Sequence, residues 1–246
     1  MSQFLDRALE VYRDQYPGSL GEAYLRGREF YEDPERVGYA PGGHVLIQSG
    51  LSPELLWNFG LIRKDGSDLF RRRVVLPYTW EGRTSCLFGR SIVPGTPKDF
   101  RHLHNRCHGR ARSELGEHSA ADTARSPWLA STGRYENWRW VKGVYGERNL
   151  DAATVMVVEG ALDAEASRLL GLPPAVALGG SGVRLLLGRL RPGQTVLACT
   201  DPDAGGELSY EVIKDALGDR VTRVKDPADY LRLRMSFLRA NSAAGA

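Results

Sequence analysis

Two short apolar runs that end in acidic residues constrain the fold of this chain more than any other feature. The first run, residues 155–158, ends on Glu159 and is followed by Asp163, and the second, residues 195–200, ends on Asp201-Pro202-Asp203. Short apolar runs bounded by turn residues are typical of buried strands. Ligands of open α/β sheets bind at the carboxyl ends of strands, and Mg²⁺ prefers oxygen ligands beside substrate phosphates. The pattern therefore predicts a magnesium site for phosphoryl transfer on nucleotides or nucleic acid.

The last third of the chain alternates between predicted strands and predicted helices. The strands cover residues 154–158, 174–178, 195–200 and 220–224, and the helices cover 161–170, 181–190, 205–217 and a segment from about 227. This alternation predicts a parallel sheet with right-handed crossovers. Five carboxylates should then meet at one sheet edge, namely Glu159, Asp163, Asp201, Asp203 and Asp226. A single Asp at a strand end is also a common helix N-cap, so that role stays open for each one alone.

The first half of the chain has a different pattern. Apolar spacing predicts an amphipathic helix over 3–16, and capping residues predict helices that begin at Ser19 and Ser52. Residues 73–78 and 83–88 read as a hairpin that turns through Glu81-Gly82. The stretch over residues 91–133 lacks regular apolar spacing, contains many arginines and four of the five histidines, and is predicted to be a long insertion or mobile loop.

Composition sets broad limits. The 246 residues are 42% hydrophobic and 26% charged, which is typical of a soluble globular protein with one large domain or two small ones. The net charge of +3 does not identify a nucleic-acid-binding protein by itself. The three cysteines are widely spaced and form no disulfide framework, which favours a reducing, cytoplasmic location. No run has transmembrane length, so no membrane partner is expected.

Three acidic segments resemble the motifs of TOPRIM domains. Residues 157–163, Val-Val-Glu-Gly-Ala-Leu-Asp, resemble the glutamate motif of that family, and residues 199–205, Cys-Thr-Asp-Pro-Asp-Ala-Gly, resemble its Asp-x-Asp motif. Residues 224–231, Val-Lys-Asp-Pro-Ala-Asp-Tyr-Leu, look like the last acidic motif of DnaG-type bacterial primases, which are one group of TOPRIM proteins.

Two upstream segments select the primases within that family. Residues 37–41, Val-Gly-Tyr-Ala-Pro, look like the Gly-Tyr-Ala-Pro segment of DnaG-type primases. Residues 70–77, with Phe88-Gly89-Arg90, look like their basic strand pair. The resemblance covers most of residues 3–235 apart from the insertion. Neither the zinc-binding domain nor the helicase-binding domain of replicative primases has a match in this sequence.

The resemblance implies an α/β fold in which a TOPRIM domain, a parallel sheet flanked by helices, is preceded by a smaller α+β primase N-terminal subdomain. We expect the N-terminal subdomain over residues 1–150, with the Arg/His-rich insertion at about 91–133. The TOPRIM metal-binding catalytic domain is expected over 151–235, followed by a tail over 236–246.

The resemblance also implies a function. DnaG-type primases are DNA-dependent RNA polymerases that make short RNA primers on single-stranded DNA by two-metal nucleotidyl transfer. The implied cofactor is Mg²⁺ or Mn²⁺, and the implied partners are a single-stranded DNA template and nucleoside triphosphates. A replicative helicase or a separate zinc-finger subunit are further partners that this family suggests.

The implied site residues follow from the matched motifs. The catalytic set is Glu159, Asp163, Asp201, Asp203 and Asp226, and the metal ligands are Glu159, Asp201, Asp203, Asp226 and Asp229. The last motif departs from the family, because Ala228 stands where the family has an Asp. Either Asp229 substitutes through a shifted turn, or one metal position is weakened.

Basic residues are expected to bind the template and the triphosphate. The candidates by match to the family are Arg71, Arg73, Arg90, Lys98, Arg134 and Lys142. Lys98 and Arg134 compete for the same family element, and Arg71 is a weaker candidate because alternate strand residues face opposite ways. The alternative for the arginine run is a solvated or salt-bridged edge strand.

Other interpretations remain open. His102, His104, Cys107 and His108 have the right side chains for zinc, but ligands this close in sequence rarely form a tetrahedral site. We therefore expect no zinc, and favour an Arg/His-rich nucleic-acid-binding loop. The alternatives for the whole chain are a TOPRIM metal-dependent nuclease and a nucleic-acid-binding module with a weakened catalytic site.

Overall fold

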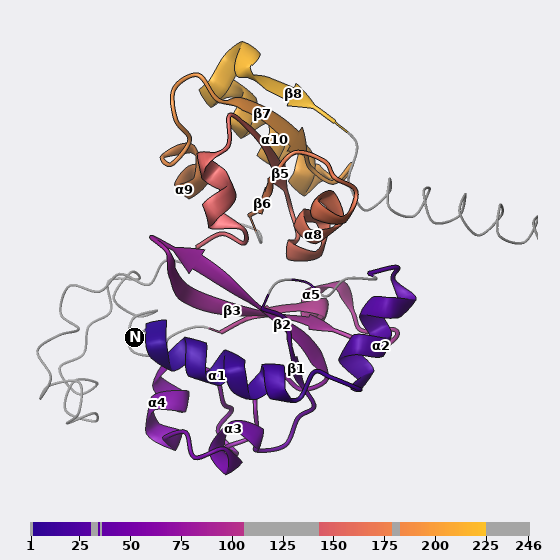
Figure 1. Cartoon of the computed structure of the whole chain (residues 1–246), viewed down its shortest axis with the longest axis vertical. Coiled ribbons are helices and arrows are strands. Elements are labelled where there is room, and N and C mark those ends of the chain that lie inside the picture. Colours follow the sequence, from indigo (N-terminus) through magenta and orange to yellow (C-terminus); the bar gives the residue numbers. More distant parts are fainter. Residues whose placement is uncertain (1, 31–33, 35, 106–142, 179–182, 225–246) are drawn as a thin grey trace, which may run out of the picture.

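The chain folds into two four-stranded sheets. The structure, a computed structural model, describes residues 2–30, 34, 36–105, 143–178 and 183–224. Within them, one sheet is ordered β1-β2-β3-β4 and the other β6-β5-β7-β8. Figure 1 shows the first sheet in the middle of the molecule, with the N-terminal helices on one side and the second sheet on the other. The predicted α/β class is confirmed.

The first sheet is antiparallel and is built around a hairpin. Its strands are β1 (Gly38–Ala40), β2 (Arg73–Trp80), β3 (Arg83–Ser91) and β4 (His102–His104). The hairpin of β2 and β3 turns through Glu81 and Gly82, which both have positive φ angles of 52° and 70°. Two positive φ values match the right-handed twist of the flanking strands, which is why a glycine occupies one of the two positions. The predicted hairpin is confirmed.

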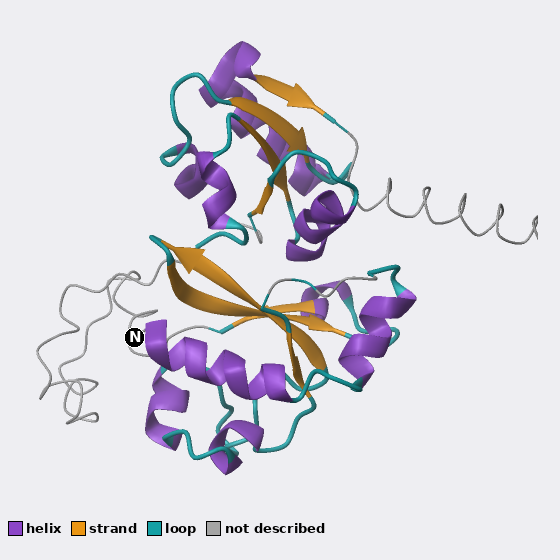
Figure 2. Ribbon diagram, in the orientation of Figure 1, coloured by secondary structure: helices purple, strands orange, loops and turns teal. Residues whose placement is uncertain are grey.

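Five helices accompany this sheet in the described part of the chain. They are α1 (Ser2–Asp14), α2 (Leu20–Gly27), α3 (Val45–Gln48), α4 (Pro53–Asn58) and α5 (Lys98–Arg101). Ser19 and Ser52 cap α2 and α4 as predicted, since each hydroxyl accepts hydrogen bonds from first-turn amides. The buried face of α1, including Leu5, Leu9 and Tyr12, belongs to one apolar cluster with residues of β2, β3 and α4. Figure 2 shows α1, α3 and α4 on the same side of the strands.

The fourth strand corrects one prediction. Residues 91–133 were expected to form an insertion, but Lys98–Arg101 is helical and His102–His104 pairs with β3. Asn105 extends this pairing, because its backbone amide donates to Leu87 O at 3.2 Å. The pattern failed here because three sheet residues, two of them histidines, carry no strand periodicity. Residues 106–133 lie outside the described residues.

The second sheet is parallel. Its strands are β5 (Thr154–Val158), β6 (Ala175–Ala177), β7 (Thr195–Cys199) and β8 (Val221–Arg223). Between them lie α8 (Ala161–Leu169), α9 (Val183–Leu187) and α10 (Ala204–Leu217). The short 3-10 helix η1 (Glu147–Asp151) precedes β5, and a second one, η2 (Gly218–Arg220), precedes β8. The predicted strand–helix alternation and parallel pairing are confirmed. The expected helix from about Pro227 lies outside the described residues.

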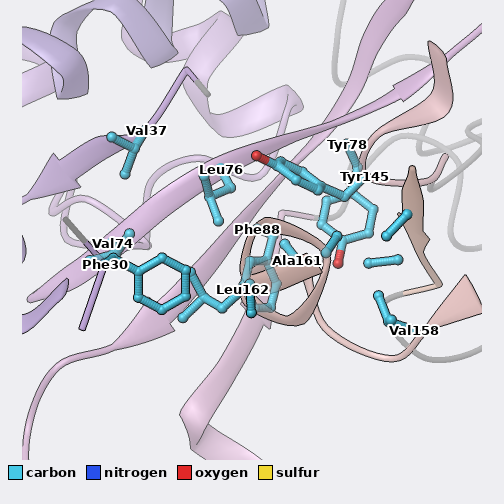
Figure 3. Close-up of a cluster of buried hydrophobic side chains, with 14 of the residues drawn as sticks. Phe30, Val37, Val74, Leu76, Tyr78, Phe88, Tyr145, Val158, Ala161 and Leu162 are labelled. Carbon is cyan, nitrogen blue, oxygen red and sulfur yellow. The ribbon is translucent and has the colours of Figure 1, made fainter. Parts of the chain in front are cut away.

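The two sheets share one apolar core. Tyr78 and Phe88 of the antiparallel sheet belong to the same buried cluster as Val158 and Leu162 near the end of β5. Figure 3 shows these side chains meeting between the hairpin and α8. Burying large aromatic side chains is worth about 1.5–3 kcal/mol each, so this seam contributes substantially to stability.

A single stretch of backbone also joins the sheets. Val144 exchanges two hydrogen bonds of 2.9 Å with Thr79 of β2, and the next residue, Tyr145, exchanges bonds of 3.1 and 3.0 Å with Ala177 of β6. Gly143 precedes them with φ +74°, and a Cβ there would lie 2.3 Å from Thr79 O. Only glycine fits this approach. The domain division near residue 150, with a tail over 236–246, stays a prediction.

No helix in the described part of the chain is long and apolar enough to cross a membrane.

Candidate functional site

The first acidic element lies at the carboxyl ends of two neighbouring strands. Val158 of β5 pairs with Cys199 of β7, so Glu159 and Asp201 follow adjacent strand ends. Glu159 Oε1 accepts a hydrogen bond of 3.0 Å from the backbone amide of Asp201. The structure therefore brings these two predicted residues together, as the parallel pairing requires.

The second acidic element begins α10. Asp203 is the N-cap of this helix, and its Oδ1 accepts hydrogen bonds of 3.0 Å from the amides of both Gly205 and Gly206. The capping role that the sequence left open for Asp203 is thus present. A carboxylate at a helix N-terminus also interacts favourably with the helix dipole.

Gly206 is a site residue that the motif comparison missed. A Cβ at this position would lie 2.0 Å from Asp201 O and 2.7 Å from Glu159 Oε1. The contact between α10 and the strand ends is therefore possible only without a side chain. The signal in the sequence is the second glycine of the pair that follows Asp203.

Asp163 lies on the first turn of α8. Its Oδ2 accepts a hydrogen bond of 3.0 Å from the Gly160 amide, closing a capping arrangement at the start of the helix. Burial, followed by the charges of Cys86 and Asp163, raises the pKa of Tyr78 well above its ordinary value. Asp163 thus stands between the strand end and the seam with the antiparallel sheet.

The donor set suits a hard divalent cation. Glu159, Asp201 and Asp203 offer carboxylate oxygens, which are the ligands that Mg²⁺ and Mn²⁺ prefer. Two of these residues already accept backbone hydrogen bonds, which orient their carboxylates before an ion binds. Within the described residues, no three Asp, Glu, His or Cys side chains come close enough to form a metal cluster alone. Asp226 and Asp229 lie outside the described residues.

The predicted basic residues differ in burial, and Arg73 is among the buried ones. Arg73 is only 7% exposed, and its guanidinium donates to the carbonyls of Gly89, Phe100 and Arg101 at 3.2, 2.6 and 3.0 Å. Burial, with smaller contributions from neighbouring arginines, lowers the pKa of Arg73 to about 10, so it remains charged near neutrality. These bonds give Arg73 a structural role, and its expected contact with nucleic acid stays a prediction.

Arg90 lies on a different face of the sheet. Residues two apart on a strand point to the same face, so Arg90 shares a face of β3 with Phe88 and Cys86. Phe88 and Cys86 belong to the seam with the parallel sheet. Arg90 is partly exposed, and its Nε donates to the Tyr24 hydroxyl at 3.3 Å. It also contacts His102 Nε2. This places Arg90 on the sheet face that packs against the parallel sheet.

The remaining basic candidates lie before β2, at the start of α5 or outside the described residues. Arg71 is exposed between α4 and β2. Lys98 begins α5, and only its backbone is described. Arg134 and Lys142 lie outside the described residues.

The histidines of the Arg/His-rich segment have separate surroundings. His102 lies beside Arg90, whereas His104 Nδ1 lies 3.6 Å from Cys86 Sγ and its ring packs edge-on against Tyr78. Cys107 and His108, the other members of the zinc interpretation, lie outside the described residues.

Two buried polar residues that the sequence analysis missed, Asn105 and Glu147, bond to the backbone of the β2–β3 hairpin. Asn105 Oδ1 accepts from the Leu87 amide at 2.6 Å, and its Nδ2 donates to Phe59 O at 2.8 Å. Glu147 accepts from the amides of Glu81 and Gly82 at 2.6 and 3.0 Å, which fixes the tip of the hairpin. No local motif marks either residue, because their partners are distant in the sequence.

Comparison with known proteins gives a consistent result at the level of structure only. No protein-family model matches the sequence, and the comparison with curated proteins gives no match. A DnaG catalytic core matches with a TM-score of 0.64 and 22% identity, over 94% of this chain and 74% of that chain. The fold is that of the DnaG primase catalytic core.

Two further matches agree with this. A DnaG primase catalytic domain bound to single-stranded DNA matches with a TM-score of 0.64 and 21% identity, over 98% of this chain and 78% of that one. A DNA primase domain from Pseudomonas aeruginosa matches with a TM-score of 0.64 and 22% identity, over 94% of this chain and 74% of that one. The predicted fold resemblance to DnaG primases is therefore confirmed.

Proposed function

We propose that this chain is the catalytic core of a primase-type RNA polymerase that synthesises or extends short RNA primers on single-stranded DNA. The observation that carries the proposal is a coincidence of fold and motif. The chain has the DnaG core fold over 94% of its length, and its two matched acidic motifs lie at adjacent strand ends joined by the bond from Asp201 to Glu159. A relative with the same fold is bound to single-stranded DNA, which supports a DNA template for this chain.

We propose that Glu159, Asp201, Asp203 and Asp226 hold Mg²⁺ or Mn²⁺, with Asp229 as a further ligand and Asp163 as a support. The bound cations would supply positive charge to the phosphates of the incoming nucleotide. Glu159 orients the loop after β7 through the Asp201 amide, and Asp203 fixes the start of α10. We propose no role for zinc.

Positive side chains would bind the phosphates of template and triphosphate. Arg90 is the best supported, because it is partly exposed on the sheet face that packs against the parallel sheet, whose strands carry the acidic motifs. Arg71, Lys98, Arg134 and Lys142 remain candidates on their match to the family. A replicative helicase and a separate zinc-finger subunit remain proposed partners.

The test is a polymerisation assay with a single-stranded template, an annealed RNA primer and labelled nucleoside triphosphates, with Mg²⁺ or Mn²⁺. We expect the primer to lengthen in the wild type, and no extension in Asp201→Asn or after EDTA. Shortened template would support the alternative TOPRIM nuclease. Template binding without any product, with intact folding, would support a binding module with a weakened site.

A further inference from the structure

A cavity of about 700 Å³ lies on the seam between the two sheets, away from the acidic elements. One wall is the hairpin, with Pro77, Thr79 and Gly82, and the other includes η1 and the start of β6. The acidic motifs stand at the ends of β5 and β7, whereas this cavity is lined by Asp151, which precedes β5, and by Ala175, which begins β6. It therefore opens at the beginning of the parallel strands, opposite to the proposed metal site.

Arginines dominate the charged lining of this cavity. Five of them reach it from the chain before β1, from η1, from α8 and from the segment after α9: Arg36, Arg148, Arg168, Arg189 and Arg191. Three carboxylates, Glu147, Asp151 and Glu165, also line it. The lining thus carries two more positive than negative charges. A planar guanidinium matches the oxygens of a phosphate with two parallel hydrogen bonds, so this surplus favours a phosphate-bearing ligand.

The carboxylates orient the arginine side chains but occupy only some of their N–H donors. Arg189 Nη1 lies 3.1 Å from Glu147 Oε1, and its guanidinium stacks on the Trp80 ring at 5.0 Å. Arg191 pairs with Asp151 near the surface. A guanidinium has five N–H donors, and partly exposed ion pairs are worth only about 0–1 kcal/mol. Arg191, whose pair with Asp151 is exposed on both sides, can therefore turn donors to a ligand at small cost. Arg189 keeps its bond to the buried Glu147 and offers a ligand only its remaining donors.

The walls are fixed before any ligand arrives. Glu147 holds the hairpin tip, and Asn149 Nδ2 donates to Ala175 O at 2.7 Å. Gln194 Nε2 donates to Leu150 O at 2.7 Å and to Ala152 O at 2.6 Å. A preformed cavity loses little entropy on binding, which is the usual condition for a small-molecule site.

The same cavity has an apolar side. Pro77 lies on the hairpin wall, and Leu172 and Pro174 lie on the loop between α8 and β6. Its volume falls in the range of about 300–1,000 Å³ that is typical of pockets for small ligands. An apolar surface beside arginines suits a flat base joined to a charged phosphate group.

We propose that this cavity is a second nucleotide-binding site, which takes a nucleoside diphosphate or triphosphate independently of the metal at the acidic edge. The arginines after α9 and on α8 would contact the phosphates, and the proline-lined wall would contact the base. The proposal does not depend on primer synthesis by this chain.

The test is a titration of the full chain with ADP and GDP that carry a fluorescent N-methylanthraniloyl group, in EDTA. The variants are Arg168→Gln and Arg191→Gln, and Arg13→Gln on α1 is the matched control because it removes the same charge from a partly exposed ion pair elsewhere. Asp201→Asn separates this site from the acidic edge. We expect binding that persists in EDTA and in Asp201→Asn, and that weakens at least tenfold in the two cavity variants only.

Several outcomes would overturn the proposal. Equal affinity in the wild type, Arg168→Gln and Arg191→Gln would place the nucleotide elsewhere. Loss of binding in EDTA or in Asp201→Asn would assign it to the acidic edge. Binding of a single-stranded oligonucleotide but of neither labelled nucleotide would make the surface a nucleic-acid contact. The primer-extension assay is read separately, so failure of either proposal leaves the other decided on its own data.

Discussion

Glu159 and Asp201 are joined by a hydrogen bond in which the backbone amide of Asp201 donates to Glu159 Oε1 at 3.0 Å. One side chain therefore connects the two acidic motifs across adjacent strands. The bond places the Asp201 backbone close to α10, where only Gly206 leaves room for it. Substitutions can therefore test separately how the backbone geometry and how the carboxylate charges of this sheet edge contribute to activity.

Glu159→Gln is expected to keep the fold and to lose synthesis. Glutamine retains an oxygen that accepts from the Asp201 amide, but it has no negative charge for a cation. We expect a loss of primer extension of about 100-fold or more, because metal-assisted charge stabilisation is worth several kcal/mol. Extension rates and urea unfolding measure the two effects. Normal extension with a normal unfolding curve would remove Glu159 from the metal site.

Asp203→Ser and Asp203→Ala should differ in stability but not in activity. Serine is a good N-cap, so it should preserve α10, whereas alanine should destabilise the protein by about 1 kcal/mol. Both remove the carboxylate, so both should abolish extension. Thermal and urea unfolding compare the two variants. Retained synthesis in the serine variant would show that Asp203 acts only as a cap.

Gly206→Ala should disturb the site through the backbone. The new Cβ would meet Asp201 O at 2.0 Å, and neither group is at the end of a flexible side chain. We expect a destabilisation of about 1–3 kcal/mol, as for other overpacked positions, together with loss of extension. Gly27→Ala on α2 is the control, since a Cβ there has nothing within 4 Å. Equal behaviour of the two variants would contradict the close contact.

Arg73→Gln and Arg90→Gln should separate structure from DNA binding. The Arg73 change leaves three carbonyls without their charged donor, so it should cost about 2–4 kcal/mol in unfolding free energy. The Arg90 change should leave stability within about 0.5 kcal/mol. It should lower the salt slope of single-stranded DNA binding by about 0.7. Fluorescence anisotropy across a salt series measures the slope. An unchanged slope in Arg90→Gln would argue against a phosphate contact there.

Asp68 gives a pH-dependent prediction. Burial raises its pKa to about 6, against the opposing effects of the Leu46 amide, His44 and Tyr12. The usual unfolded value is about 3.9, so between about pH 4 and 6 the folded state binds a proton that the unfolded state has lost. Unfolding free energy should therefore fall as pH rises through this window, by up to about 3 kcal/mol from this group.

Asp68→Asn keeps a polar side chain of the same shape and has no proton to lose. The stability difference between wild type and variant should shift in favour of the variant as pH rises from about 4 to about 7. Urea unfolding at several pH values measures this difference. A constant difference across the series would show that Asp68 titrates normally in the folded protein.

Local signals predicted most of the fold. The predictions of caps at Ser19 and Ser52, of a hairpin turn at Glu81-Gly82 and of parallel strands over 154–158 and 195–200 all depend on neighbouring residues, which a sequence displays directly. The pairing of β5 with β7 then placed Glu159 beside Asp201 without further information.

Long-range contacts were not predictable in this way. Arg73 is predicted to bind nucleic acid by its match to the family, but the sequence does not show that its guanidinium donates to carbonyls of α5, 27 and 28 positions away. Glu147 fixes amides 65 and 66 positions away, and β4 exists only through pairing with β3. The local sequence pattern does not determine which distant backbone atoms a side chain will contact in the folded protein.

The consecutive bonds of Val144 to β2 and of Tyr145 to β6 have a mechanical consequence. A hinge between the sheets would have to break both bridges and pull Tyr78 and Tyr145 out of their shared core. Two such ring burials cost several kcal/mol to reverse, which exceeds thermal energy severalfold. The two sheets of the described part of the chain therefore move as one rigid unit. In the proposed reaction, the template and the growing primer move along this unit.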